Sequence, residues 1–491
     1  MTLMRIFLSR TVTAATSIVA LALLFTFFIT PSLIAFATLD QNREAAEARK
    51  LLPIESNQID DWPSGPAIGA AAAILYEVNT GVILYAKDIH GKQYPASTTK
   101  LMTCLMAIEN ASLNDIVPFS RTAVTSISWD SANIGISAGQ SLSMEHALYA
   151  QMVASANEVS NGIAEFVGGD METFAQMMTD RAAELGARST NFINAHGLSD
   201  EEHYTTAYDM ALIAAAFFRN EMLAKIGNTV TYTIPATETQ PNEIFMRNRH
   251  RLIIGEFETE YTIVGGKTGY TNLSRQTLVT CAEMDGMRLV CVIFKQESPD
   301  QFHDTVTLFD YGFSNFQIVN VADNETRYTI ENAGFFHTGN DIFGDSSPFL
   351  SLNRSDHLVM PRYADFDDLA TEISYQTDRR AAVAEITYRY NDVFLGMATI
   401  DYATPNRSTF DFDHNMPVIE EEVAPVIEEN VVFINVRQAV FLIVGIALAV
   451  ILFFFIRTAI KDYRYNRRYR KKRRKKPTRR KRRDRFKGYY L

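Results

Sequence analysis

The stretch that most constrains this 491-residue chain is Tyr94–Thr103, which places a serine and a lysine at the start of an apolar run. Pro95 is suited to the first turn of a helix, where its missing N–H costs nothing. Ser97 and Lys100 are three residues apart, so their side chains share one helical face. Apolar residues that would carry this helix into a core follow at Leu101, Met102, Leu105, Met106 and Ile108. The sequence therefore predicts a helix that buries a lysine beside a serine.

A serine beside a buried lysine indicates nucleophilic chemistry. A serine hydroxyl is a weak nucleophile until a neighbouring base takes its proton. Lysine can be that base only if burial lowers its pKa towards neutrality. The position of Ser97 near a helix N-terminus also favours negative charge developing on its oxygen. The pattern Ser-x-x-Lys is common by chance, so it needs support from other parts of the chain.

A second polar pair follows an apolar segment with helical spacing, Ser141–Ala154. Ser155 and Asn157 come directly after it, and two such side chains on a loop can face one cleft. There they could pass a proton to a leaving group and hold a substrate amide. The alternative is a helix cap, since both residue types are favoured at that position. A similar pair at Ser131 and Asn133 is rejected, because no apolar helix precedes it.

A third polar group, Lys267-Thr268-Gly269, follows a β-prone run and predicts a strand that edges a cleft. Lysine supplies a positive charge and threonine a hydroxyl for an anionic end of a substrate. Glycine removes the side chain where a substrate must lie flat on the strand. The nine histidines show no metal-ligand spacing, and His196 is interpreted as a structural loop residue. No metal or cofactor is expected.

Two long uncharged runs indicate export and a membrane anchor. The run 11–38 follows two arginines and ends in Ala-Phe-Ala at 35–37, a pattern suited to signal peptidase. An uncleaved anchor is the alternative. The run 438–456 would span roughly 28 Å as a helix, enough to cross a bilayer core.

The charge is distributed unevenly along the chain. Residues 458–491 hold 18 Lys and Arg with two acidic residues, whereas the rest of the chain carries a net charge of −26. A basic tail behind a membrane helix is expected on the cytoplasmic side. Contact with anionic lipid headgroups is favoured over nucleic-acid binding, and topology signalling without a specific partner stays open.

The three cysteines offer no disulfide framework. A two-residue turn at Asp285-Gly286 would pair Cys281 with Val290 and place Cys281 and Cys291 on opposite faces of a hairpin. We therefore expect Cys104, Cys281 and Cys291 to be free thiols. Other patterns predict a hairpin over 77–85, a helix over 205–218 capped by Thr206, and strands at 384–389 and 394–400.

The three polar groups occur in the order Ser97-x-x-Lys100, Ser155-x-Asn157 and Lys267-Thr268-Gly269. This triple resembles the penicillin-recognising serine enzymes. The longer stretches 95–103, 196–198 and 204–209 are similar to the low-molecular-weight D-alanyl-D-alanine carboxypeptidases in particular. The resemblance covers roughly residues 66–300 well, and more weakly a small β-rich domain after them.

The resemblance implies an α+β fold of the serine β-lactamase and penicillin-binding-protein type, in which helices flank an antiparallel sheet. It implies that a small all-β domain follows this domain, and the uncharged run 438–456 adds a C-terminal transmembrane helix. The resulting segments are a signal peptide or anchor (1–37), a polar lead-in (38–65), the catalytic domain (66–315), the β-rich domain (316–403), a Pro/Glu-rich stalk (404–436), a transmembrane helix (437–457) and a basic cytoplasmic tail (458–491). The catalytic domain would lie outside the cytoplasm.

The resemblance also implies a role for each matching residue. Ser97 would attack the penultimate D-alanine of a peptidoglycan stem peptide ending in D-Ala-D-Ala, and Lys100 would accept its proton. Ser155 would relay a proton to the departing D-alanine, while Asn157 orients Lys100 and the substrate. The terminal carboxylate would be bound by Lys267 and Thr268 beside Gly269, and the N–H groups of Ser97 and Tyr270 would form the oxyanion hole. β-Lactam antibiotics would bind covalently to Ser97.

Two departures from the family pattern bear on specificity. Ser274-Arg275 stands where a small Ala-Gly pair is usual, and His250 stands where a second asparagine is common. A bulky cation near the cleft could narrow the choice of substrate. A β-lactamase-like hydrolase is the alternative enzyme, although no Glu-x-x-Leu-Asn element lies between Ser155 and Lys267. A non-catalytic wall-binding protein of the same fold is the alternative from another class.

Overall fold

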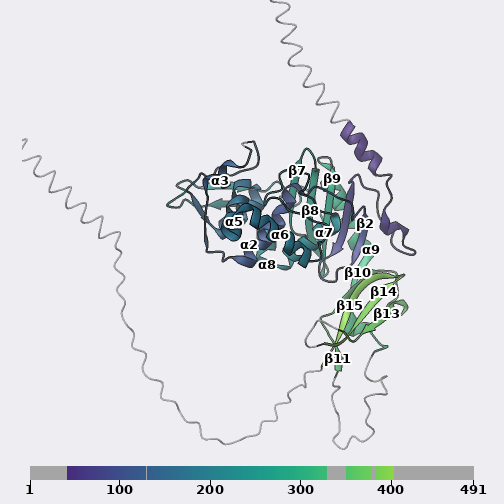
Figure 1. Ribbon diagram of the computed structural model, residues 1–491. Coiled ribbons are helices and arrows are strands. Elements are labelled where there is room, and N and C mark those ends of the chain that lie inside the picture. The colour runs from purple at the N-terminus through teal and green to yellow at the C-terminus, as the bar shows by residue number, and fades with distance from the viewer. Residues whose placement is uncertain (1–40, 129, 329–349, 377–381, 403–491) are drawn as a thin grey trace, which may run out of the picture. The chain divides into compact units, whose positions relative to one another are not determined.

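The computed structural model describes residues 41–128, 130–328, 350–376 and 382–402. At its centre is a five-stranded antiparallel sheet in the order β2-β1-β9-β8-β7 (Figure 1). Its strands are β1 (Ala72–Glu77), β2 (Ile83–Lys87), β7 (Thr262–Thr271), β8 (Arg275–Met284) and β9 (Met287–Gln296). β7, which carries the Lys-Thr-Gly sequence, is an edge strand.

Two turns set the register of this sheet. The expected β1–β2 hairpin is confirmed, and the Glu77 carboxylate accepts hydrogen bonds from the backbone N–H and the hydroxyl of Thr80. Asp285 and Gly286 both have positive φ, as a two-residue turn between twisted strands requires. Cys281 pairs with Val290 as expected.

The sheet buries both of its faces. Alternate residues of β1 belong to two separate hydrophobic clusters, with Ile74 in one and Leu75 in the other. Cys281 and Cys291 are likewise divided between the two clusters. Both cysteines are buried and free, and so is Cys104, which confirms the expectation of three free thiols.

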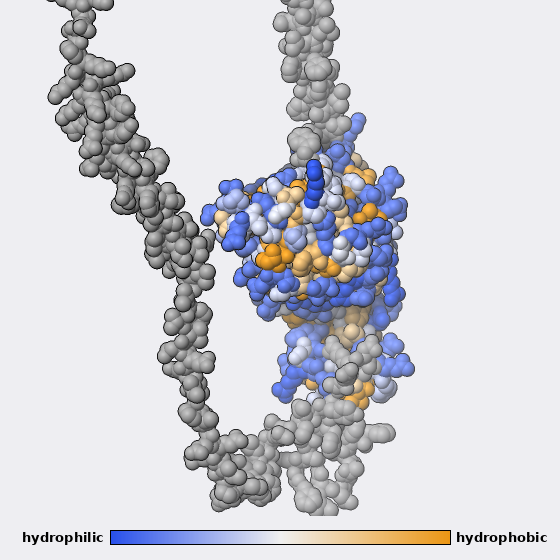
Figure 2. Space-filling model, turned by 60° about the vertical axis from the view of Figure 1, so that its left-hand side comes forward, coloured by the Kyte–Doolittle hydropathy of each residue, from blue (hydrophilic) through white to orange (hydrophobic). Residues whose placement is uncertain are grey.

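Helices cover each face of the sheet. One cluster is filled by a layer of helices comprising α2 (Lys100–Asn110), α4 (Met144–Tyr149), α5 (Asn157–Gly168), α6 (Met171–Glu184), α7 (Ala207–Arg219) and α8 (Glu221–Gly227). The other is filled by α9 (Asp300–Asn315) (Figure 1). The Thr206 hydroxyl accepts from the Asp209 N–H at the start of α7, as the sequence predicts. Figure 2 shows hydrophilic side chains over most of one face of the molecule, with apolar residues gathered near its middle.

The segment 141–154, expected to be one helix, is composite. Ser141–Ser143 forms strand β4, which pairs with β3 (Ile116–Pro118), and Ser143 then caps α4. The last residues, Ala150–Ala154, form a π-helical turn (η3). The prediction of a single helix was therefore wrong, because a cap and a strand pairing interrupt the apolar periodicity. A short helix, α3 (Arg121–Thr125), and a hairpin of β5 (Thr231–Ile234) and β6 (Ile244–Arg247) complete this region.

The part of the predicted lead-in that the structure describes is packed rather than a loose polar connection. Residues 41–49 are helical, and η1 (Glu55–Gln58) follows. Trp62 is buried, and its indole N–H donates to the Leu84 carbonyl at 3.1 Å. The Ser56 hydroxyl accepts from the Ala86 N–H at 3.2 Å. These contacts make the segment part of the β2 side of the fold.

Those residues after α9 that the structure describes form two small antiparallel sheets. One pairs β10 (Phe316–Asn320) with β12 (His357–Pro361), and the other has the order β11-β15-β14-β13. The latter consists of β11 (Leu350–Leu352), β13 (Ala370–Ser374), β14 (Ala382–Tyr390) and β15 (Val393–Tyr402), with α10 (Val321–Asn324) and η4 (Phe366–Asp368) between strands. The expected strands at 384–389 and 394–400 are thus confirmed.

The predicted signal peptide, stalk, transmembrane helix and basic tail lie outside the described residues. Among the residues that the structure does describe, no helix is both long and apolar enough to cross a membrane.

Candidate active site

Lys100 lies at the centre of the site, on the first turn of α2. A 3₁₀ turn, η2 (Ala96–Thr99), precedes it and carries Ser97. The Lys100 Nζ lies 3.2 Å from the Ser97 Oγ, 2.7 Å from the Asn157 Oδ1 and 2.7 Å from the His196 carbonyl oxygen. Residues from three distant parts of the chain therefore meet at one amine.

The surroundings of Lys100 favour the neutral amine. Its side chain is fully buried, and burial, followed by the nearby charge of Lys267, lowers the pKa of Lys100 well below its usual value. A neutral amine has two protons and one lone pair. The two carbonyl oxygens, of Asn157 and His196, can accept the two protons, which leaves the lone pair for the Ser97 hydroxyl. This is the arrangement that a general base requires.

Ser155 and Asn157 directly follow the η3 turn, and the Asn157 side chain reaches Lys100. Ser155 has φ +62°, a left-handed conformation that is strained for a serine and is often found at functional sites. Asn157 begins α5 and is buried, and its backbone N–H donates to the Ala132 carbonyl at 2.9 Å. The loop that holds the rejected pair Ser131 and Asn133 thus supports Asn157 through its backbone.

Lys267 lies on β7 with its side chain buried. Its Nζ donates to the Thr268 carbonyl at 3.0 Å. Burial, with a smaller contribution from the nearby charge of Arg249, lowers the pKa of Lys267 to about 7. Sequence reasoning missed Arg249, because nothing in the sequence distinguishes it from its neighbours Arg247 and Arg251.

Gly269 allows β7 to approach the serine. A Cβ at this position would lie 2.9 Å from the Ser97 backbone nitrogen, closer than any side chain could stay without a shift. The N–H of Ser97 and the strand at Gly269–Tyr270 are therefore neighbours. This places the two expected oxyanion-hole residues on adjoining segments.

Gly197 allows a second close approach, on the other side of η2. It has φ +86°, and a Cβ there would overlap the Ala96 carbonyl oxygen. This close packing delivers the His196 carbonyl to Lys100. The His196 ring is buried, and burial lowers its pKa to about 3, so the ring stays neutral. The contribution of His196 comes from its backbone, which no sequence pattern could have indicated.

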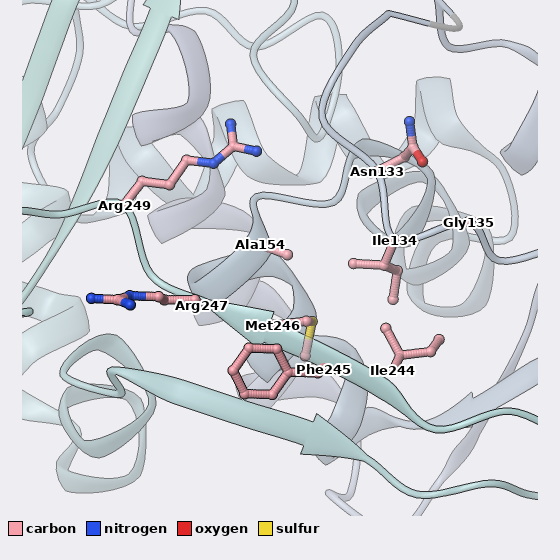
Figure 3. Close-up of a pocket in the computed structure, with 9 residues that line it drawn as sticks. All are labelled: Asn133, Ile134, Gly135, Ala154, Ile244, Phe245, Met246, Arg247 and Arg249. Carbon is pink, nitrogen blue, oxygen red and sulfur yellow. The ribbon is translucent and has the colours of Figure 1, made fainter.

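A cavity of about 390 Å³ opens beside the site (Figure 3). It is lined by Asn133, Ile134, Gly135, Ala154, Ile244, Phe245, Met246, Arg247 and Arg249. In Figure 3, Arg249 and Asn133 lie on opposite sides in the upper part of the view, and Phe245, Met246 and Ile244 lie below them. Ala154 directly precedes Ser155, so the cavity continues the site on the side of the second serine.

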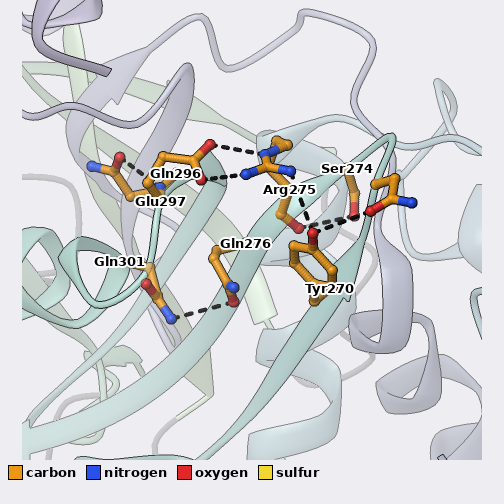
Figure 4. Close-up of polar contacts among 8 residues, drawn as sticks. Tyr270, Ser274, Arg275, Gln276, Gln296, Glu297 and Gln301 are labelled. Carbon is orange, nitrogen blue, oxygen red and sulfur yellow. Dashed lines mark hydrogen bonds and ion pairs between the residues drawn. The ribbon is translucent and has the colours of Figure 1, made fainter. Parts of the chain in front are cut away.

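The two departures from the family pattern have structural explanations. Arg275 is paired with Glu297 through two hydrogen bonds, so it is not a free cation at the cleft (Figure 4). His250 is buried behind β7, with its Nε2 2.9 Å from the Thr280 Oγ1, and burial lowers its pKa to about 3. Among the described residues, no group of three or more His, Cys, Asp or Glu side chains could hold a metal ion.

Comparison with solved structures shows the fold of the chain. The solved structure of penicillin binding protein 5 from Haemophilus influenzae matches with a TM-score of 0.55 and 22% sequence identity. The match covers 69% of this chain and 98% of that one. The chain therefore has the mixed helix-and-sheet fold of the penicillin-binding proteins, as expected.

Sequence comparison defines the family. Residues 60–298 match the Peptidase S11 family, described as D-alanyl-D-alanine carboxypeptidase. D-alanyl-D-alanine carboxypeptidase DacB2 of Mycobacterium tuberculosis is 30% identical over 265 residues, which cover 51% of this chain and 84% of that protein. DacF of Bacillus subtilis is 33% identical over 254 residues, which cover 50% of this chain and 63%, less than two thirds, of that protein. The chain belongs to the D-alanyl-D-alanine carboxypeptidase family, whose members act through a serine acyl-enzyme.

Proposed function

We propose that this protein is a serine-type DD-carboxypeptidase that removes the terminal D-alanine from peptidoglycan stem pentapeptides. The observation that carries the proposal is the buried Lys100 amine, 3.2 Å from the Ser97 Oγ and held by two carbonyl oxygens. The family comparisons support the same reaction.

In the acylation step, Ser97 Oγ attacks the carbonyl of the penultimate D-alanine while Lys100 takes the hydroxyl proton. The N–H groups of Ser97 and Tyr270 stabilise the oxyanion. As the C–N bond breaks, Ser155 relays the proton that Lys100 took from Ser97 to the amine of the departing D-alanine, which leaves Lys100 neutral again. Asn157 keeps the Lys100 amine in place throughout.

Substrate binding depends on the positive charge near β7, where the terminal carboxylate of the substrate would lie. Lys267 and Thr268 bind the terminal carboxylate, and Arg249 adds a second cation nearby. A flat path over Gly269 lets the peptide lie along β7.

Water then hydrolyses the acyl-enzyme. A β-lactam antibiotic would acylate Ser97 by the same route.

We also propose that the catalytic domain faces the outside of the cell membrane. The support comes from the uncharged runs 11–38 and 438–456 and from the basic tail 458–491. A protease added to intact cells should remove the catalytic domain and leave the tail, whereas a protected catalytic domain would contradict this topology.

The reaction is tested by D-alanine release from a peptide ending in D-Ala-D-Ala. Ser97→Ala removes the nucleophile and should lower the rate by about 10⁵-fold or more. Labelling with a fluorescent penicillin should be lost in the same variant. Release that persists in Ser97→Ala would refute the assignment of the nucleophile, and rapid turnover of penicillin by the wild type would favour a β-lactamase.

A further inference from the structure

The tip of the β7–β8 hairpin carries an arginine in a backbone conformation that side chains rarely adopt. Arg275 has φ +56°, in the region where glycine is at no steric disadvantage. Its guanidinium is held by Glu297, with Nε 2.9 Å from Oε1 and Nη2 2.5 Å from Oε2 (Figure 4). Glu297 directly follows β9, so the pair joins the hairpin tip to the end of that strand.

The same guanidinium also holds Tyr270. The Arg275 Nη1 donates to the phenolic oxygen at 3.3 Å, and the guanidinium carbon lies 5.7 Å from the ring centroid. The Tyr270 hydroxyl donates in turn to the Asn272 Oδ1 at 3.2 Å. Although it is tied down at its polar end, Tyr270 is 51% exposed. A fixed ring with exposed carbon atoms is suited to binding.

Folding stability does not explain this arrangement. A largely buried ion pair such as this one adds little net stability, because the cost of desolvation offsets the attraction, and left-handed backbone at a non-glycine residue costs stability. A glycine at position 275 would need neither the strain nor the partner. Strain that specific contacts hold in place is typical of functional sites.

The proposed path of the substrate leads past this ring. With the terminal carboxylate at Lys267 and Thr268, the scissile carbonyl would lie at Ser97, beside Gly269. An extended peptide would continue from there along β7 towards the hairpin tip, rising about 3.3 Å per residue. The residue before the D-Ala-D-Ala pair would then reach the hairpin tip.

We propose that Arg275, held by Glu297, is a positioning residue that fixes the Tyr270 ring as one wall of a subsite for the residue preceding D-Ala-D-Ala. The inference rests on the carboxypeptidase function proposed above and specifies part of its substrate. Leu273, which is 40% exposed at the same tip, supplies a second apolar surface. Because the charge of Arg275 is already paired, the subsite binds the aliphatic part of a long side chain.

Two acetylated tripeptides distinguish an effect on this subsite from an effect on the reaction centre. Acetyl-L-norleucyl-D-Ala-D-Ala and acetyl-glycyl-D-Ala-D-Ala differ only in the side chain that would reach Tyr270. D-Alanine release is measured for the full chain, for Arg275→Gly, Glu297→Gln and Tyr270→Ala, and for the double variant at 270 and 275. Arg275→Gly relieves the backbone strain, and Glu297→Gln breaks the ion pair without changing the backbone.

The neighbouring β8–β9 hairpin supplies a matched control. Glu283 pairs with Arg288 at the opposite end of the β8–β9 hairpin, with a separation of 2.6 Å. Glu283→Gln therefore removes an ion pair from the same two strands, far along them from Tyr270. Penicillin labelling checks that each variant is folded.

The wild type should prefer the norleucine peptide by about tenfold in kcat/KM, mainly through KM. Arg275→Gly and Glu297→Gln should bring this preference close to one, and Glu283→Gln should keep it. Tyr270→Ala should lower the preference as much as Arg275→Gly does. The double variant should lower it no more than either single variant, because Arg275 acts through the Tyr270 ring. A merely structural role of Arg275 would not produce this coupling.

The inference is overturned if the wild type shows no preference, if Arg275→Gly keeps it, or if the two substitutions are additive. An equal fall in kcat for both peptides would also overturn it, because it would place the effect at the reaction centre. A wild type that releases no D-alanine from either peptide contradicts the proposed function itself. That result differs from an active enzyme without a preference.

Discussion

Lys100 and Lys267 are both buried lysines, yet the proposed reaction needs one neutral and the other charged. Lys100 has two carbonyl oxygens within 2.7 Å and a serine hydroxyl at 3.2 Å, contacts that a neutral amine satisfies. The charge of Lys267 also disfavours a second ammonium beside it. Two titratable groups whose surroundings separate their protonation states are typical of acid–base sites.

This difference predicts the pH dependence of the reaction. A lysine is charged below its pKa, and the pKa of Lys267 is lowered to about 7 in the free protein. Carboxylate binding should therefore weaken as the pH rises, so kcat/KM should fall about tenfold per pH unit well above pH 7. The fall in kcat should occur at higher pH, because a bound carboxylate raises the pKa of Lys267.

Steady-state kinetics between pH 6 and 9 would measure the fall in kcat/KM and the fall in kcat with rising pH. Lys267→Arg serves as the comparison, because a guanidinium stays charged throughout this range. The fall in kcat/KM at alkaline pH should be absent in that variant. A fall at the same pH in the wild type and the variant would show that a group other than Lys267 controls substrate binding.

At the scale of elements, the site depends on how closely three segments approach η2. The loop at 196–198 supplies a carbonyl oxygen, β7 supplies its flat edge at Gly269, and α5 supplies Asn157. None of these segments is close to η2 in the chain. The approaches at Gly197 and Gly269 require glycine, so a side chain at either position should push its segment away from η2.

Gly197→Ala tests this dependence. The substitution adds the cost of a left-handed alanine, about 1–2 kcal/mol, and an overlap with the Ala96 carbonyl oxygen. It should lower the melting temperature and move the His196 carbonyl away from Lys100, with a loss of penicillin acylation of about 100-fold or more.

Gly255→Ala is the matched control. Gly255 also has a positive φ, at +78°, but a Cβ there meets no atom within 4 Å. This variant should lose a similar amount of stability from backbone strain and retain acylation. Equal acylation rates in the two variants would argue against the close approach at Gly197 as a requirement.

At the scale of the whole molecule, burial of histidines links folding to pH. Burial lowers the pKa of His196 and His250 to about 3 and that of His203 to about 4. An unfolded histidine has a pKa of about 6.5. The unfolded chain therefore binds more protons between about pH 4 and 6.5, so the free energy of unfolding falls as the pH is lowered through this window.

His250→Asn should reduce this pH dependence. One proton fewer taken up on unfolding corresponds to about 1.4 kcal/mol per pH unit. Urea unfolding at several pH values between 4.5 and 6.5 measures the slope. His90→Asn, at an exposed position, controls for the loss of one imidazole. A slope unchanged by His250→Asn would mean that His250 does not contribute to the linkage.

The parts of the fold that could be predicted depend on neighbours in the chain. The Asp285-Gly286 turn determined the pairing of Cys281 with Val290, because a two-residue turn has one register. The periodicity at 205–218 and the cap at Thr206 predicted α7. The interpretation of 141–154 as one helix was wrong, since the pairing of β4 with β3 depends on a strand more than 20 residues away.

By itself, the sequence determined the three polar groups, their order, the helix that buries Lys100 and the free thiols. Side-chain type and local spacing carry that information. Only the tertiary structure decided which backbone atoms complete the site: the carbonyls of His196 and Ala132, and the contact of Gly197 with Ala96. It also decided that Glu297 neutralises Arg275. Every residue has a carbonyl group, so its use depends on which distant segments pack together.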